Sequence, residues 1–182
     1  MLVSTPAGEP AVKVLRRGDG VLETEIGRFH ATCAQVTADG YLLTAGHCLP
    51  ADRDLHVSIH GFRDGLRKAR TVKVWGKPID LALLKIDSPG PAWFPLGPAE
   101  VADRDLVISA GLRPVSFSIR LQTDDLVGVR LVTEESPVDV TAGHAVKVEP
   151  FTRQTGFRQL TTTMPLVPGN SGGAVIDASG RL

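Results

Sequence analysis

The sequence predicts an all-β protein, and three observations support that prediction. Short runs of about 4–9 residues, rich in Val, Ile, Leu and Thr, recur along the 182-residue chain. Glycine and proline, with 19 and 13 copies, are spread evenly between these runs. Long stretches with the 3.6-residue period of a helix are absent. A regular succession of short strands and turns is typical of a β-sandwich or a β-barrel.

The predicted strands follow one another along most of the chain. They are Val21–Ile26, Arg28–Val36, Tyr41–Thr44, Leu55–Ile59, Thr71–Trp75, Asp80–Ile86, Asp105–Ala110, Ser116–Leu121, Leu126–Thr133, Ala145–Val148, Gln159–Met164 and Ala174–Ile176. The tripeptide Ala38-Asp39-Gly40 predicts a hairpin between two of them, because Asp-Gly favours a tight turn. The segment Leu96–Asp103 is the candidate linker, so we expect two β-rich halves, residues 1–98 and 99–182.

Composition and charge argue against several classes of function. Twenty basic residues balance twenty acidic ones, so we expect neither a nucleic-acid partner nor an anionic membrane. No apolar run approaches the ~20 residues that a membrane helix needs. The N-terminal segment lacks the pattern of a signal peptide. Two cysteines are too few for a protein built on a disulfide scaffold.

A glycine-flanked serine near the C-terminus is the first candidate for chemistry. It stands in Pro168-Gly169-Asn170-Ser171-Gly172-Gly173, where the glycines free the backbone and leave room for a substrate carbonyl. The amides of Gly169 and Ser171 could point at one oxygen as an oxyanion hole, in which a lost donor costs about 3 kcal/mol. A glycine-rich turn with a surface serine would explain the same pattern. The nucleophile elbow of α/β-hydrolases is excluded, because no histidine follows Ser171.

A serine nucleophile needs a base, and the base needs an acid that fixes its tautomer. The candidate bases are His30, His47, His56, His60 and His144. His47 follows an apolar run, and Asp80 opens the nearly all-apolar run that ends at Ile86. An aspartate in that position is expected to be partly buried and to need a partner. It either caps a turn at the end of the strand or pairs with a protonated histidine.

Three blocks of the sequence resemble the signatures of trypsin-like, chymotrypsin-fold serine proteases. They are Thr44-Ala45-Gly46-His47-Cys48, Asp80-Leu81-Ala82-Leu83-Leu84 and Gly169-Asn170-Ser171-Gly172-Gly173, in that family's order of His, Asp and Ser. The likeness is greatest to compact bacterial members of the Deg/HtrA type, and it covers roughly residues 28–182. The resemblance implies two six-stranded antiparallel β-barrels, a chymotrypsin-like double barrel, with the active site in the cleft between them.

By this resemblance, His47 is the general base, Asp80 is the acid that orients it, and Ser171 is the nucleophile. The amides of Gly169 and Ser171 would form the oxyanion hole. The implied activity is that of a serine endopeptidase, which hydrolyses peptides or proteins through an acyl-enzyme and needs no metal or cofactor. The alternative is an inactive protease-fold module that binds a peptide or a partner chain.

The sequence departs from the family at two places. Asn170 stands where digestive relatives of trypsin carry an aspartate that pairs with a new N-terminal amine, so we expect no activation of that kind. The chain stops at Leu182, whereas family members continue through further strands. We therefore expect the second barrel to be incomplete, or to be completed by a partner chain or oligomer.

The two cysteines flank the predicted hairpin, and the resemblance implies a disulfide between Cys33 and Cys48. It would close a loop of about 15 residues, contribute on the order of 3 kcal/mol, and favour an extracytoplasmic compartment. Two reduced, buried thiols in a cytosolic protein are the alternative. A zinc site that adds His30 and His47 to these cysteines is disfavoured, because residues three apart along a strand point to opposite faces.

The tetrapeptide Thr-Ala-Gly-His occurs a second time, at Thr141-Ala142-Gly143-His144. No run headed by an acidic residue lies between this copy and Ser171. We interpret it as a glycine-bearing bend between two strands and expect no catalytic role for His144. Strand or surface positions are expected for His30, His56 and His60.

Overall fold

The structure is a computed structural model that describes residues 2–6, 12–16, 21–26, 29–49, 51, 53–58, 66–97, 101–112, 119–124, 128–133, 138–150, 156, 158–167 and 169–182. Within these residues the regular structure consists of antiparallel strands and one short 3-10 helix, η1 (Gly46–Cys48). The prediction of an all-β protein is therefore confirmed. No helix in this part of the chain is long and apolar enough to cross a membrane.

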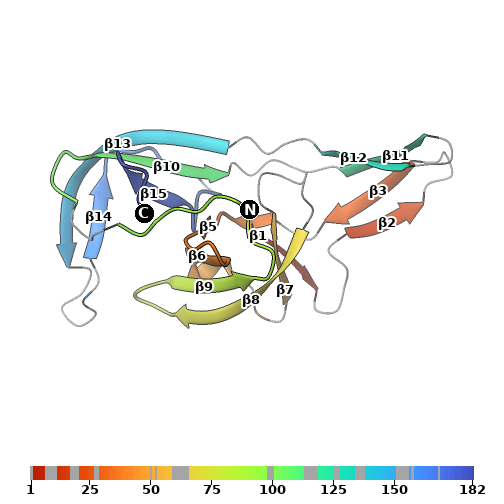
Figure 1. The fold of residues 1–182 in the computed structure, drawn as a ribbon, viewed down its shortest axis with the longest axis horizontal. Coiled ribbons are helices and arrows are strands. Elements are labelled where there is room, and N and C mark those ends of the chain that lie inside the picture. Colours follow the sequence, from red (N-terminus) through yellow and green to blue (C-terminus); the bar gives the residue numbers. More distant parts are fainter. Residues whose placement is uncertain are drawn as a thin grey trace.

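A seven-stranded sheet gathers strands from the first half of the chain (Figure 1). In the order β4-β1-β7-β8-β9-β6-β5, its strands are β4 (Phe29–Ala31), β1 (Leu2–Pro6), β7 (Arg53–Ser58), β8 (Leu66–Trp75), β9 (Leu81–Ile86), β6 (Tyr41–Ala45) and β5 (Ala34–Gln35). Along β9, buried residues alternate with less buried ones, as expected for a strand with one face on the core. Its Leu84 and Ile86 pack with Leu42 and Val57 in the hydrophobic core.

The predicted hairpin at Ala38-Asp39-Gly40 is present between β5 and β6. The amide of Val36 donates to the carbonyl of Tyr41 at 2.9 Å, and the amide of Gly40 donates to that of Thr37 at 3.2 Å. Gly40 has a φ of 93°, and a Cβ atom there would lie 2.5 Å from the carbonyl oxygen of Ile86. Glycine is therefore required at this turn by both backbone conformation and space.

A four-stranded sheet belongs to the second half. Its order is β14-β13-β10-β15, with β14 (Arg158–Thr162), β13 (Val138–Pro150), β10 (Leu106–Leu112) and β15 (Ala174–Asp177). The interpretation of Thr141–His144 as a bend is wrong, because these residues lie inside the continuous 13-residue strand β13. They pair in regular register with Leu106–Ser109 of β10, and Gly143 keeps the extended backbone of its neighbours.

A third sheet combines strands from both halves of the chain. Its order is β12-β11-β3-β2, with β12 (Gly128–Thr133), β11 (Ile119–Asp124), β3 (Val21–Ile26) and β2 (Val12–Arg16). Figure 1 shows it to one side of the other two sheets. The pairing of β3 with β11 joins strands from before and after residue 98. The division at residue 98 stays a prediction, and residues 98–100 of the candidate linker lie outside the described part.

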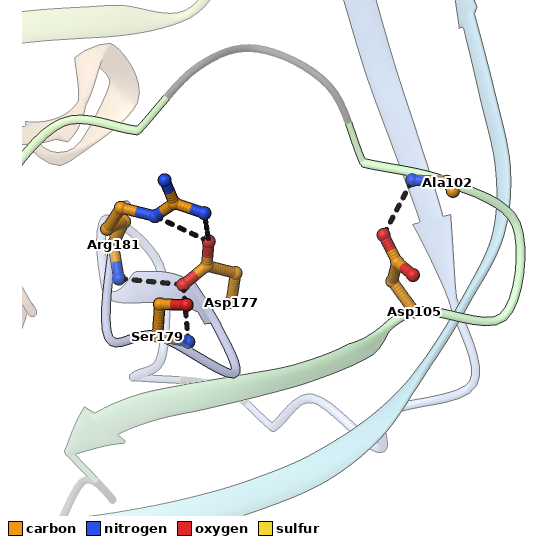
Figure 2. Close-up of polar contacts among 5 residues, drawn as sticks. All are labelled: Ala102, Asp105, Asp177, Ser179 and Arg181. Atoms are coloured by element: carbon orange, nitrogen blue, oxygen red, sulfur yellow. Dashed lines mark hydrogen bonds and ion pairs between the residues drawn. The ribbon is translucent and has the colours of Figure 1, made fainter.

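Backbone hydrogen bonds fasten the end of the first half to residues beyond β15. The amide of Gly97 donates to the carbonyl of Leu182 at 2.8 Å, and the amide of Leu182 donates to that of Pro95 at 2.9 Å. The preceding turn is fixed by Asp177, which accepts from the amides of Ser179 and Arg181 and binds the guanidinium of Arg181 (Figure 2). These bonds, those from Arg181 foremost, lower the pKa of the Asp177 carboxyl.

Candidate active site

The segment that carries His47 leaves the sheet where β6 ends. Thr44, one residue before the end of β6, is only 1% exposed, and the chain then turns into η1. The amide of Gly46 donates to the carbonyl oxygen of Asp80 at 2.8 Å, so this turn is tied to the start of β9. The side chain of His47 is 58% exposed and points away from the core.

Asp80 lies at the end of a tight turn between β8 and β9. The amides of Ile79 and Asp80 both donate to the carbonyl of Gly76, at 3.0 and 3.2 Å. Asp80 itself has a φ of 56°, in the left-handed region. Aspartate tolerates that region better than most residues, because its short carboxylate can accept local hydrogen bonds. The turn thus directs the carboxylate toward η1.

Both carboxylate oxygens of Asp80 engage His47. Oδ2 lies 2.6 Å from Nδ1 of the imidazole, and Oδ1 accepts from the amide of His47 at 2.7 Å. The hydrogen bond from the imidazole, helped by the one from the amide, lowers the pKa of the Asp80 carboxyl against an opposing effect of burial. The Asp80 side chain is 40% exposed, which agrees with the expected partial burial. Since Nδ1 donates to the carboxylate, Nε2 is the ring nitrogen left to act as a base.

The loop that carries Ser171 connects β14 to β15. Two turns shape this loop. The amide of Asn170 donates to the carbonyl of Val167 at 3.1 Å, and the amide of Gly173 donates to the carbonyl of Asn170 at 2.8 Å. Gly172 has a φ of 77°. A Cβ atom on Gly172 would lie 2.2 Å from Oγ1 of Thr44, so the loop runs directly against β6. The structure therefore places Ser171 beside the segment that leads to His47.

The predicted catalytic residues are not all in contact with one another. Within the described residues, no hydrogen bond joins Ser171 to His47, although His47 and Asp80 are in direct contact. The amides of Gly169 and Ser171, the predicted oxyanion donors, donate no backbone hydrogen bond within the same part of the chain.

Thr32 holds the serine loop and was not among the predicted site residues. It lies between β4 and β5 and is 8% exposed. Its amide donates to the carbonyl of Ser171 at 2.9 Å, and its Oγ1 donates to the carbonyl of Gly169 at 2.9 Å. No local sequence pattern marks this residue, because its partner Gly169 lies 137 positions away.

Asn170 is buried beneath the loop, against β10. The residue is 8% exposed, and a Cβ atom on Gly111 would lie 2.5 Å from its Oδ1. Within the described residues, neither Oδ1 nor Nδ2 of Asn170 has a hydrogen-bond partner. The close contact with Gly111 fixes where the residue before Ser171 can lie.

The predicted disulfide is absent, because Cys33 and Cys48 are both free thiols. Cys48 is buried in the hydrophobic core and Cys33 packs against it, so both act as small apolar side chains. Burial, followed by the charge of Asp80, raises the pKa of the Cys48 thiol. The two cysteines therefore give no support for an extracytoplasmic compartment.

Two of the remaining histidines, His144 and His56, lie on other strands, β13 and β7. His144 bonds through its amide to Oγ1 of Thr163 at 2.9 Å, and its Nδ1 lies 3.1 Å from the carbonyl oxygen of Arg104. His56 is half-buried in β7, and that burial lowers its pKa. His60 and the side chain of His30 lie outside the described residues. Within those residues, no three His, Cys, Asp or Glu side chains form a cluster that could hold a metal ion.

Comparison with known protein families matches residues 31–182 to the trypsin-like peptidase domain. The chain belongs to that family. The trypsin-like peptidase domain therefore begins at the end of β4 and includes all three blocks that carry His47, Asp80 and Ser171. No curated protein matches the chain.

Among solved structures, this trypsin-like peptidase domain is similar to HtrA-type proteases. One is AlgW with a decapeptide, with 25% identity and a TM-score of 0.58 over 88% of this chain and 43% of that chain. Another is a variant of AlgW with a decapeptide, with 27% identity and a TM-score of 0.56 over 84% and 40%. The chain thus spans less than half the length of these structures. The resemblance to Deg/HtrA-type proteases is confirmed.

Proposed function

We propose that the chain is a serine endopeptidase, or the catalytic part of one, that uses Ser171, His47 and Asp80. The observation that carries the proposal is the double contact of the Asp80 carboxylate with His47. It fixes the ring against rotation and leaves Nε2 as the base. Membership of the trypsin-like peptidase family and the likeness to HtrA-type proteases support the same activity.

In the proposed reaction, each of these groups has one task. As the peptide carbonyl arrives, Nε2 of His47 takes the proton of the Ser171 hydroxyl and Oγ bonds to the carbonyl carbon. The carbonyl oxygen becomes an oxyanion, to which the amides of Gly169 and Ser171 would donate. The imidazolium, stabilised by Asp80, then gives its proton to the leaving amine. Water attacks the acyl-enzyme by the same route and releases the acid.

A fluorophosphonate probe tests the nucleophile, since it bonds covalently only to an activated serine. We expect mass spectrometry to find the probe on Ser171, and Ser171→Ala to abolish labelling. Ser179→Ala is the matched control, because Ser179 is an exposed serine in the turn after β15, and it should label like the wild type. Probe that remains bound in Ser171→Ala, or a wild type that does not react, would contradict the proposal.

A peptide-binding module without hydrolysis is the second candidate. It is favoured by the absence, within the described residues, of a hydrogen bond between Ser171 and His47. The HtrA-type structures to which the chain is similar are described with bound peptides. Fluorescein-labelled casein separates the two candidates: a binding module raises the anisotropy of the label without producing fragments, whereas a peptidase produces fragments that Ser171→Ala does not.

A further inference from the structure

Three hydrogen bonds link the strand before His47 to the loop of Ser171, and all three pass through Thr32. Oγ1 of Thr44, in β6, donates to the carbonyl of Thr32 at 2.8 Å. The Thr32 amide then donates to the carbonyl of Ser171, and the Thr32 hydroxyl donates to the carbonyl of Gly169. Both Thr32 and Thr44 are buried, so little water competes for these bonds.

From these three hydrogen bonds we propose that Thr32 is a positioning residue: it holds the backbone of Gly169 so that the Gly169 amide can donate to the oxyanion. This inference rests on the proposed peptidase activity. The Thr32 amide would keep its bond with any residue other than proline at this position. The bond from Oγ1, in contrast, needs a hydroxyl and acts on the residue that supplies one of the two oxyanion donors.

Gly169 needs such an anchor because its backbone is unusually free. Its φ is 98°, a region that glycine enters easily and leaves easily. The hydroxyl of Thr32 fixes the peptide plane that follows Gly169, and this restrains the rotation of the residue whose amide must face the oxyanion. An oxyanion donor accelerates the reaction only when it is already oriented as charge develops. Loss of the anchor should therefore slow acylation without weakening the initial binding of substrate.

The test compares two substitutions in the full chain. Thr32→Val keeps the shape of the side chain and removes the hydroxyl, whereas Thr32→Ser keeps the hydroxyl and removes the methyl group. Labelling by the fluorophosphonate probe is followed over time to separate the maximal rate constant, kinact, from the concentration constant, KI. Thermal unfolding of each variant is measured alongside.

We expect Thr32→Val to lower kinact by about tenfold, which matches the loss of one buried hydrogen bond, and to change KI by less than about twofold. Thr32→Ser should stay within about threefold of the wild-type kinact. If Thr32→Val does not fold, Thr32→Cys, whose thiol is a weaker donor, replaces it and should lower kinact in the same way.

Each outcome decides the question. A kinact that is unchanged in Thr32→Val, a loss that appears in KI instead, or a Thr32→Ser variant as slow as Thr32→Val would overturn the role of the hydroxyl while leaving the peptidase proposal intact. A wild type that is not labelled at Ser171 would contradict the proposed function itself, and this inference would fall with it.

Discussion

The two copies of Thr-Ala-Gly-His have the same four residues and different structures. In the first copy, the chain leaves β6 after Ala45 and turns into η1, and Asp80 binds both the ring and the amide of His47. The second copy remains inside β13, paired residue by residue with β10, and His144 faces the carbonyl of Arg104. The difference lies in the neighbouring segments: the turn before β9 offers the carboxylate of Asp80 to the first copy, whereas the second copy pairs with β10 and meets the backbone carbonyl of Arg104.

The comparison shows how a histidine becomes a candidate base. In a strand, the pairing with a neighbouring strand fixes the backbone of a histidine but does not fix the orientation of its ring. At the end of β6 the backbone is instead bonded to Asp80, both at Gly46 and at His47, so the same residue that fixes the backbone also fixes the ring. Matched substitutions in the two copies can therefore test the comparison.

The histidines should differ most. His47→Ala removes the proposed base and should lower the labelling rate of Ser171 by about four orders of magnitude or more. His144→Ala should leave that rate within about twofold of the wild type, since the His144 ring lies against the carbonyl of Arg104 and makes no hydrogen bond to His47, Asp80 or Ser171 within the described residues. The labelling kinetics of the two variants measure this difference directly. Equal losses in both variants would show that the second copy also serves the reaction.

The glycines of the two copies, Gly46 and Gly143, should differ in the opposite sense: substitution in the second copy should cost more stability than substitution in the first. A Cβ atom on Gly143 would lie 2.7 Å from the backbone nitrogen of Met164, so Gly143→Ala should destabilise the fold by about 2 kcal/mol. A Cβ atom on Gly46 would lie 3.1 Å from Oδ1 of Asp80, a distance that a small shift relieves. Gly46→Ala should therefore unfold closer to the wild type but label more slowly, because the carboxylate moves. Urea unfolding and labelling rates, measured on both variants, check the pair.

The threonines provide a subtler contrast. Oγ1 of Thr44 donates to Thr32, so Thr44→Val should lower the free energy of unfolding by about 1–2 kcal/mol. Oγ1 of Thr141 is buried with no hydrogen-bond partner among the described residues. Thr141→Val should therefore be neutral or slightly stabilising. A destabilisation by Thr141→Val as large as that by Thr44→Val would contradict this reasoning.

The smallest expected effect is on the pH dependence of stability. Because its pKa is lowered in the folded protein, Asp80 adds stability that is fully present above its unfolded pKa of about 4. That contribution is lost as the pH falls through the lower folded value. As the pH is lowered from about 5 to about 2, the Tm of thermal unfolding should therefore fall less steeply in Asp80→Asn than in the wild type. The carboxylate is 40% exposed, so solvent keeps the difference small.

Much of the fold could be predicted because single strands leave local patterns. Val21–Ile26 is β3 without adjustment, and Asp80–Ile86 differs from β9 only at Asp80, whose positive φ places it in the turn. Strands β1 and β2 were missed. The first ends in a proline, and the second carries lysine and arginine among its apolar residues, so neither has the composition of the other runs.

The sequence could predict those candidate site residues that stand in short, recognisable motifs, and not those that depend on distant partners. The contact of His47 with Asp80 follows from a turn that heads β9, whereas the role of Thr32 depends on partners in a distant loop. The prediction of a disulfide was wrong for another reason. It was inferred from the resemblance alone, and two cysteines on either side of a hairpin pack equally well as separate thiols.

The span of the Thr32–Gly169 bond has a consequence for how the site forms during folding. The contact of His47 with Asp80 closes a loop of 33 residues, whereas the bond from Thr32 to Gly169 closes one of 137. The longer loop costs about 1 kcal/mol more in chain entropy. His47 and Asp80 can thus come into contact while the rest of the chain is still unfolded, and the loop of Ser171 docks against them later. During refolding, the recovery of labelling at Ser171 should trail the recovery of sheet structure.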